Sequence, residues 1–233
     1  LRDHAAAIRR HALADLPALL ERFEARASAA GARLHWVEEA GGLGPLVHEL
    51  LRERGATRVV KSKSMLTEEC GLNPYLEARG VEVVDTDLGE RIVQLAGERP
   101  SHLMVPAIHR TREQVGELFH RELGTPEGES DPERLTRAAR RALRARFLEA
   151  DAAVTGVNFA VAETGTLCVV TNEGNADLGT ALAPLHVACL GIEKVIPTMA
   201  DLAPLLRLLA RSATGPPLSA YTSLWTGPRS GGE

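Results

Sequence analysis

Short apolar runs alternate with helix-patterned segments over the first two thirds of the chain, and this alternation restricts the fold more than any other feature. Strands are expected at 57–60, 81–84 and 103–108, with helices at 65–79 and 111–123 between and after them. Segments in this order form right-handed βαβ units, in which helices cover a parallel sheet. The sequence therefore predicts an α/β fold with a mainly parallel, Rossmann-like sheet and flanking helices.

Other segments add to this pattern or interrupt it. The apolar runs 159–162 and 166–170 flank a polar corner, which predicts a β-hairpin insert. The remaining expected elements are one or two helices at 3–30, a short strand at 33–38, a helix at 46–54, a long helix at 132–150, strands at 185–192 and 194–196, and a helix at 199–210.

The 233 residues, 44% of them apolar, can build one large α/β domain or two small ones, and we expect one structural domain overall. We expect residues 1–54 to form a helical region packed on an α/β part at 55–228, and residues 229–233 to begin a linker. The net charge of −4 favours no nucleic-acid partner, and the basic run 134–146 has the helical spacing of a solvated face. Every apolar stretch is shorter than the ~20 residues that span a membrane, and no signal peptide is visible.

Three cysteines occur, and their spacing is typical of neither a zinc site nor an iron–sulfur site. Their odd number argues against a disulfide framework. Cys168 and Cys189 lie inside apolar runs, where a thiol usually packs as a small hydrophobic group. We therefore expect a cytoplasmic protein that binds no metal or cofactor within these residues.

A polar cluster follows the first strand of the alternating region, where that strand gives way to a helix. Its members are Lys61, Ser62, Lys63 and Ser64. Ligands of open α/β sheets bind at the carboxyl ends of strands, and ammonium groups, hydroxyls and helix N–H groups suit a phosphate or carboxylate. The alternative is a helix capped by Ser64, with Glu68 favouring the helix dipole. That alternative explains the serine and the acid but leaves the lysines unexplained.

A second cluster occupies the corner of the expected hairpin. It comprises Glu163, Thr164, Gly165 and Thr166, and a further polar group follows at Asn172, Glu173, Gly174 and Asn175. A glutamate walled by apolar side chains would have a raised pKa and could act as nucleophile or general base. The N–H groups of the turn could also bind an anion. The alternatives are a surface glutamate on a plain hairpin and a second turn.

Two more candidates lie elsewhere in the sequence. His109 directly follows the strand expected at 103–108, a favoured place for a functional side chain, although a structural histidine is the commoner interpretation. Arg211 lies beside two hydroxyl residues and could bind an anion. A helix that stops at Gly215 explains the same segment equally well.

Three motifs, KSKSM at 61–65, AETGT at 162–166 and NEGN at 172–175, occur in this order. Together they resemble the LUD domain family, and more closely the LUD domains at the N-terminus of lactate-utilization proteins. The resemblance covers roughly residues 55–228. It implies a fold similar to sugar-phosphate isomerases and CoA transferases, and a role in a cytoplasmic iron–sulfur complex that oxidises L-lactate to pyruvate.

The resemblance also implies other lactate-utilization subunits as partners, and [4Fe-4S] clusters in a ferredoxin-like segment outside these residues. Lys61, Lys63 and Arg211 would then hold the lactate carboxylate, and Glu163 or His109 would take the hydroxyl proton. Because lactate oxidation releases two electrons, we expect these residues alone to be inactive. Two alternatives stay open. One is an independent CoA-transferase-like or isomerase-like enzyme using Glu163, and the other is a scaffold with its polar corners in an interface.

Overall fold

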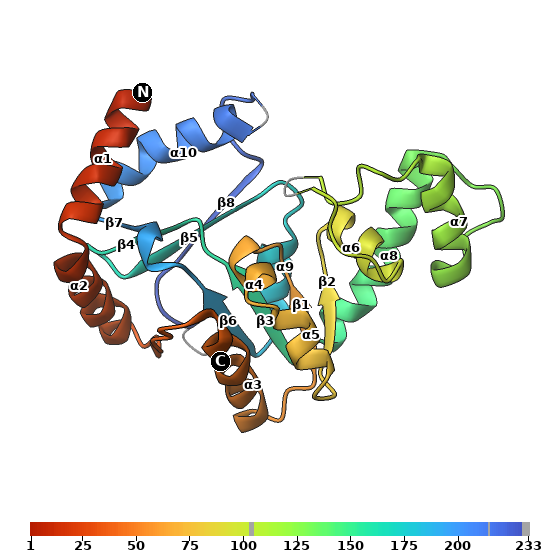
Figure 1. The fold of residues 1–233 in the computed structure, drawn as a ribbon, viewed down its shortest axis with the longest axis horizontal. Coiled ribbons are helices and arrows are strands. Elements are labelled where there is room, and N and C mark those ends of the chain that lie inside the picture. Colours follow the sequence, from red (N-terminus) through yellow and green to blue (C-terminus); the bar gives the residue numbers. More distant parts are fainter. Residues whose placement is uncertain (103–104, 214, 230–233) are drawn as a thin grey trace. The chain divides into compact units, whose positions relative to one another are not determined.

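The computed structural model describes residues 1–102, 105–213 and 215–229 (Figure 1). The chain divides into two compact units. The parallel-sheet unit comprises residues 39–155 and 175–187, and the mixed-sheet unit comprises residues 1–38, 156–174 and 188–233.

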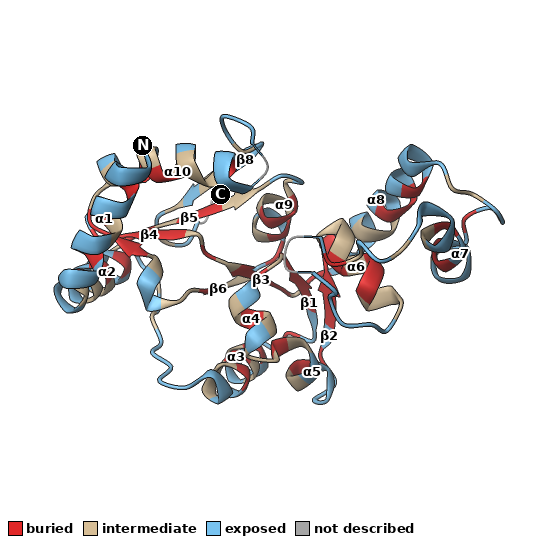
Figure 2. Cartoon of the chain, turned by 45° about the horizontal axis from the view of Figure 1, so that its top comes forward, coloured by how far each residue is buried: buried red, intermediate tan, exposed pale blue. Residues whose placement is uncertain are grey.

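The parallel sheet has the strand order β2-β1-β3-β6. Its strands are β1 (Arg58–Lys61), β2 (Glu82–Asp85), β3 (Ala152–Gly156) and β6 (Leu185–Cys189). β1 pairs in parallel with both β2 and β3, which places Lys61 opposite Asp85 and Val154. The central strands are buried almost without interruption, as expected for a sheet covered on both faces (Figure 2). The predicted α/β class and parallel sheet are confirmed.

Helices account for most of the remaining parallel-sheet unit. They are α3 (Ala40–Glu53), α4 (Met65–Glu69), α5 (Leu72–Glu77), α6 (Leu88–Leu95), α7 (Arg112–Leu123), α8 (Pro132–Glu149) and α9 (Asn175–Leu182). Gly179 of α9 lies where an added Cβ would be 3.4 Å from Val60 and 3.6 Å from Phe147. This close approach packs the middle of α9 against β1 and α8.

The mixed-sheet unit contains a second sheet with the order β7-β4-β5-β8. Its strands are β4 (Phe159–Val161), β5 (Thr166–Thr171), β7 (Val195–Ile196) and β8 (Tyr221–Trp225), and its helices are α1 (Arg2–Ala14), α2 (Leu16–Ala29), α10 (Met199–Ala213) and the 3-10 turn η1 (Ile192–Lys194). β4 and β5 pair antiparallel, so the predicted hairpin is confirmed, and β7 and β8 extend it. Ile8, Phe159 and Leu205 belong to the core under α1 and α10.

Several sequence predictions about individual elements were wrong. Residues 33–38, all of them described, form no strand; Leu34 packs on the core of the mixed-sheet unit, but Trp36 and Val37 stay exposed. The helix expected at 65–79 is two helices, since Gly71 has φ 63° and interrupts it. Elements β3, α6, α9 and β8 were not predicted. The boundaries expected at 54/55 and 228/229 stay predictions, and residues 230–233 lie outside the described part.

The strand expected at 103–108 is also absent from its described portion. Residues 106–109 form a turn, and residues 103–104 lie outside the described residues. Pro106 cannot donate a backbone hydrogen bond to a sheet, and its carbonyl instead accepts from the backbone N–H of Ser101 at 3.1 Å. His109 therefore lies in a turn and does not follow a strand.

Candidate functional site

Lys61 ends β1 with a side chain that is 1% exposed, which is unusual for a lysine. Its ammonium forms an ion pair with Glu68 of α4 and lies 3.0 Å from Oδ1 of Asp85 on the neighbouring strand. Asp85 ends strand β2, and Glu68 belongs to the short helix that follows β1. A buried ammonium is tolerated only when it is paired in this way.

The protonation of this pair is set by a competition between burial and charge. Burial disfavours the ammonium of Lys61, but Asp85 and Glu68 together outweigh it and raise the lysine pKa, so the side chain stays charged. At Asp85 burial prevails over the attraction of Lys61, and its pKa is raised. Asp85 thus holds its proton more readily than an exposed aspartate.

Residues at and after the end of β2 hydrogen-bond to their neighbours at the carboxyl ends of the strands. Asp85 accepts a hydrogen bond from Nδ2 of Asn73 at 2.9 Å, and its own N–H donates to Oε1 of Gln94 at 3.1 Å. Thr86 donates to the carbonyl of Lys61 through both its N–H, at 2.9 Å, and its hydroxyl, at 3.0 Å. These contacts hold the ends of β1 and β2 in register.

Lys63 lies on the loop that leaves β1 and is more accessible than Lys61. Its ammonium is 2.6 Å from Oε1 of Glu90, and its side chain is 27% exposed. Its backbone N–H donates to Oδ2 of Asp87 at 2.6 Å. Ser62 is buried, with its N–H donating to the carbonyl of Val154 at 3.1 Å.

Ser64 caps α4. Its hydroxyl accepts from the N–H of Thr67 at 3.3 Å, and the Thr67 hydroxyl returns a hydrogen bond to the Ser64 carbonyl at 2.9 Å. The capped-helix alternative therefore accounts for this serine. It does not account for Lys61 and Lys63, whose partners come from α4, β2 and α6.

Asn175 joins the same cluster from a distant part of the sequence. Its Nδ2 donates to Oγ1 of Thr86 at 2.9 Å and to Oδ2 of Asp87 at 2.8 Å. The residue is 6% exposed, and its Oδ1 has no hydrogen-bond partner among the described residues. Two separately predicted groups, Lys61–Ser64 and Asn175, thus meet at one edge of the parallel sheet.

We call this group the strand-end cluster. It consists of Lys61, Lys63, Glu68, Asp85, Thr86, Asp87, Glu90 and Asn175. Two ammonium groups face four carboxylates, so the cluster has a formal excess of negative charge. The sequence analysis considered Glu68 only for the helix dipole and missed Asp85, Asp87 and Glu90, although Asp85, Thr86 and Asp87 lie at or directly after the end of an expected strand.

The hairpin corner differs from its expected form. Glu163 is exposed and lacks the predicted apolar walls, and its Oε2 accepts from the N–H of Met199 at the start of α10. The N–H groups of Thr164 and Gly165 both donate to the carbonyl of Val161, at 3.4 and 2.9 Å. These two donors are used within the turn, so the expected anion-binding arrangement is not formed by them.

The remaining candidates of the mixed-sheet unit have different contacts. The hydroxyl of Thr164 donates to that of Thr166 at 2.7 Å. Thr166 shares a hydroxyl contact of 2.6 Å with Thr226 of the same unit. Oδ1 of Asn172 accepts from the N–H of Ala220 at 3.5 Å, and Glu173 and Gly174 lie on the exposed turn that follows β5. Arg211 is exposed in the last turn of α10. Their anion-binding roles stay predictions.

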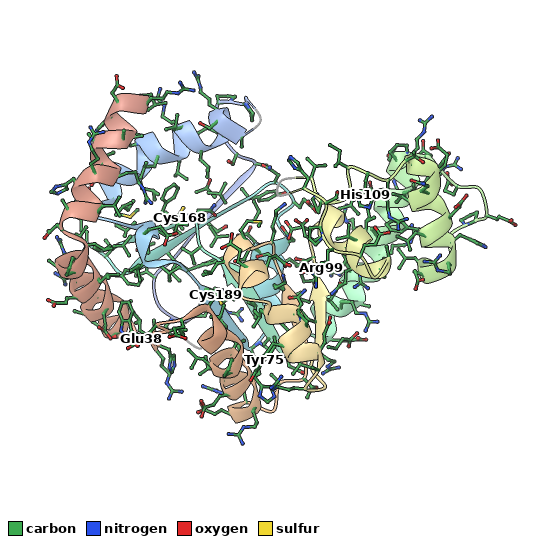
Figure 3. The ribbon with its side chains drawn as sticks, in the orientation of Figure 1. Glu38, Tyr75, Arg99, His109, Cys168 and Cys189 are labelled. Carbon is green, nitrogen blue, oxygen red and sulfur yellow. The ribbon has the colours of Figure 1, made fainter. Side chains whose placement is uncertain are left out.

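His109, which is labelled in Figure 3, belongs to a small hydrogen-bonded network. Its Nε2 lies 2.7 Å from Oε2 of Glu98, and its Nδ1 lies 2.8 Å from the hydroxyl of Ser101. Arg110 and His109 hydrogen-bond to Glu98 and lower its pKa. The histidine is well oriented, but its proposed role in proton transfer is untested.

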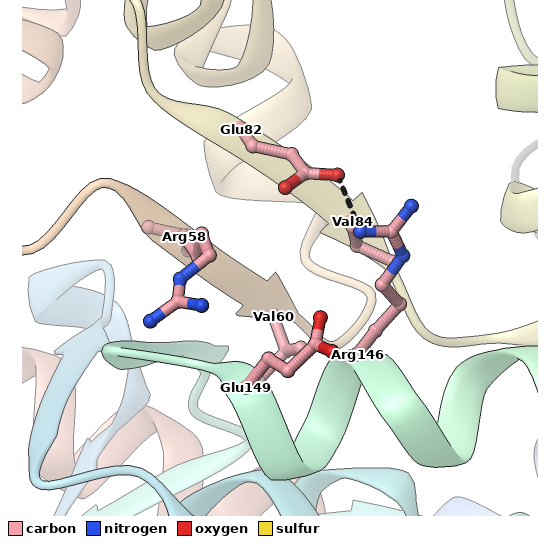
Figure 4. Close-up of a pocket in the computed structure, with 7 residues that line it drawn as sticks. Arg58, Val60, Glu82, Val84, Arg146 and Glu149 are labelled. Atoms are coloured by element: carbon pink, nitrogen blue, oxygen red, sulfur yellow. Dashed lines mark ion pairs between the residues drawn. The ribbon is translucent and has the colours of Figure 1, made fainter.

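A small cavity lies at the opposite end of the parallel sheet (Figure 4). Its volume is about 10 Å³, enough for about one water molecule. Charged residues of β1, β2 and α8 line it, including Arg146, whose Nη1 lies 3.0 Å from Oε1 of Glu82. This cavity is too small for an organic ligand.

The cysteines do not fit an iron–sulfur cluster, which usually takes four thiolates. Cys168 and Cys189 are buried, as predicted, and Cys70 is partly buried. Burial raises the pKa of Cys168 to about 11. Within the described ranges no three or more His, Cys, Asp or Glu side chains are placed to ligate one metal ion together. No described helix is both long and apolar enough to cross a membrane.

Comparison with known proteins identifies clear relatives. Residues 20–233 match the family described as LUD domain, which confirms the resemblance seen in the sequence. An uncharacterized electron transport protein, YkgF, from Escherichia coli strain K12 is 43% identical over 232 residues, which cover all of this chain and 49% of that protein. Lactate utilization protein B of Geobacillus thermodenitrificans is 42% identical over 233 residues, with the same coverage of both chains.

A further relative and a solved structure agree with this result. Lactate utilization protein B of Bacillus pumilus is 46% identical over 223 residues, covering 95% of this chain and 47% of that protein. The chain thus spans about half the length of these curated relatives. A crystal structure of a DUF162 family protein from Deinococcus radiodurans has a TM-score of 0.52 at 15% identity, covering 91% of this chain and 89% of that one. This likeness supports the fold alone.

Proposed function

Since the chain belongs to the LUD domain family, we propose that it is the LUD part of a lactate-utilization protein. In this proposal the whole protein works with other subunits in a cytoplasmic iron–sulfur complex that oxidises L-lactate to pyruvate. The observation that carries the proposal is the 42–46% identity, over 95–100% of this chain, to proteins named lactate utilization protein B.

In this proposal, substrate binding and electron transfer are carried out by different parts of the complex. Oxidation of L-lactate to pyruvate releases two electrons and two protons. The three cysteines here do not fit a cluster, so we place the electron acceptors on [4Fe-4S] clusters held outside these residues. The LUD domain would then bind the small carboxylate or a partner subunit.

Lys63 is the group best placed to contact a carboxylate. Lys61 is buried and already neutralised by two acids, whereas the Lys63 ammonium is partly exposed and forms an ion pair with Glu90. A carboxylate ligand could share this ammonium with Glu90. Glu163 and His109 remain the predicted proton acceptors, and Arg211 a second predicted carboxylate contact.

The alternative of an independent CoA-transferase-like or isomerase-like enzyme is not favoured. It requires a reactive Glu163 supported by donors of the turn, but this side chain is exposed and holds the N–H of Met199. The donors of Thr164 and Gly165 are bound to Val161. The relatives' names also give no support for acyl or phosphate-ester substrates.

An anaerobic visible spectrum tests the proposal. The natural full-length protein would be co-expressed with its partner subunits and measured before and after addition of L-lactate. The proposal expects a broad band near ~400 nm, typical of thiolate-bound iron–sulfur clusters, that bleaches with lactate. A preparation without iron and sulfide, or clusters that never respond to lactate, would contradict it.

A further inference from the structure

The strand-end cluster has more negative than positive charge at a site that is largely shielded from water. Two lysines face four carboxylates, and the nearby Glu77 and Arg91 add charges of opposite sign that cancel. An excess of charge of one sign in a buried site is costly. The cluster would therefore gain stability from one additional cation.

The hydrogen bonds of Asn175 indicate the same kind of ligand. A carboxylate can only accept hydrogen bonds, so the contact with Asp87 fixes the Nδ2 side of the amide. The Thr86 hydroxyl donates to the Lys61 carbonyl and can accept from that same Nδ2. Oδ1 of Asn175 is consequently a fixed, buried acceptor that lacks a donor within the described part of the chain. A buried acceptor of this kind is costly unless a donor or a cation meets it.

We propose that the strand-end cluster binds a singly charged cation of about the size of ammonium or potassium, with Oδ1 of Asn175 as one of its contacts. Excess charge and the unsatisfied amide oxygen are independent observations, and each calls for a positive or hydrogen-donating ligand. A small ion is required because Asn175 is only 6% exposed. The proposal goes beyond the proposed function and does not depend on it.

The direct test measures thermal unfolding of the 233-residue chain in potassium, ammonium or choline chloride at equal ionic strength. Choline serves as the control, because it carries the same charge but is too large to reach a buried oxygen. We expect saturable stabilisation by potassium, ammonium or both over choline, as expected for a ligand that binds the native state. A response to potassium alone would indicate an ion held by oxygen atoms, and a response to ammonium alone would indicate an ion held by donated hydrogen bonds. Equal stability in all three salts would overturn the proposal.

Two charge variants test the location of the cation, with opposite expected effects. Glu90→Gln removes a negative charge and should weaken the apparent affinity at least about fivefold, whereas Lys63→Met removes a positive charge and should strengthen it. The matched controls are Glu193→Gln and Lys194→Met, because this pair is also a Lys–Glu ion pair but is exposed. They should leave the affinity unchanged.

The pattern of these results separates this proposal from the lactate proposal. Effects of the same sign at Glu90 and Lys63, or equal effects at the control pair, would overturn the cation site. If a variant unfolds, Asn175→Ala should abolish the potassium or ammonium response while keeping a cooperative transition. A carboxylate site would instead make Lys63→Met weaken lactate binding, so each proposal can fail without the other.

Discussion

The ammonium of Lys61 lies 3.0 Å from Oδ1 of Asp85, across the carboxyl ends of two neighbouring parallel strands. Both side chains are more than nine-tenths buried, and Glu68 completes the arrangement. Buried ion pairs contribute little to stability compared with apolar packing, but removing one partner leaves the other charge buried and unpaired. The pair therefore marks a place where the chain retains polar groups at a cost.

Replacement of Lys61 by methionine should destabilise the fold strongly. Asp85 and Glu68 would lose their cation, and breaking a buried pair in this way costs about 3–5 kcal/mol. The free energy of unfolding from urea titrations would measure the loss. The double variant Lys61→Met with Asp85→Leu should recover part of it, and a double variant no more stable than the single one would contradict this account.

Gly165 should tolerate no side chain. Its φ is 71°, and an added Cβ would lie 2.4 Å from the backbone nitrogen of Ala27. Gly80 is the matched control, because its φ is 79° but its added Cβ would meet no described atom within 4 Å. Gly80→Ala should cost only the left-handed penalty of about 1–2 kcal/mol. In urea titrations, Gly165→Ala should lower the free energy of unfolding by at least about 2 kcal/mol more than Gly80→Ala does. Equal losses would show that the contact with Ala27 is not tight.

His186 should make the fold sensitive to mild acid. Burial lowers its pKa to about 4, from an ordinary value of 6.5, and its Nε2 lies 2.8 Å from the hydroxyl of Thr155. Between these values the unfolded chain binds more protons than the folded one, so stability falls as the pH drops from 6.5 towards 4. The variant His186→Asn should lack this loss of stability, which amounts to at most about 3 kcal/mol. Urea titrations over the same pH range would measure the difference. An unchanged pH profile would contradict the partial burial of this ring.

The thiols should differ in reactivity. Cys70 is partly exposed, whereas Cys168 is buried with its pKa raised to about 11. Since the thiolate is the reactive form, brief treatment of the native chain with iodoacetamide should modify Cys70 well before Cys168. Peptide mass spectrometry would measure both, with urea-unfolded chain as the control in which all three react. Equal labelling in the native state would argue against the buried position of Cys168.

The sequence predicted those features that depend on local patterns. Valine-rich runs and glycine stops identified β1 and β2, and the polar corner identified the β4–β5 hairpin. β3 was missed because its alanine-rich sequence lacks a strong strand signal, and a strand was wrongly expected where Pro106 forms a turn.

Only part of the candidate site could be predicted from the sequence. Lys61 and Lys63 were found because they follow a strand, but their acidic partners come from other elements. The contact between Asn175 and Asp87 joins residues 88 positions apart, which no local pattern encodes. The same rule of strand ends, applied after β2, would have identified Asp85 and Asp87 as members of the site.

The most direct test of the central claim, that the parallel-sheet edge serves lactate utilization, is lactate-dependent reduction of the iron–sulfur absorption in the complete complex. The measurement compares Lys63→Met with Lys194→Met, since each lysine forms an ion pair with a glutamate but only Lys63 belongs to the strand-end cluster. We predict that Lys63→Met lowers the rate of bleaching at low lactate at least about tenfold, because it removes one charge-assisted contact to the substrate. The Lys194→Met complex should bleach at the rate of the unmodified complex. Equal rates in both variants would contradict the claim.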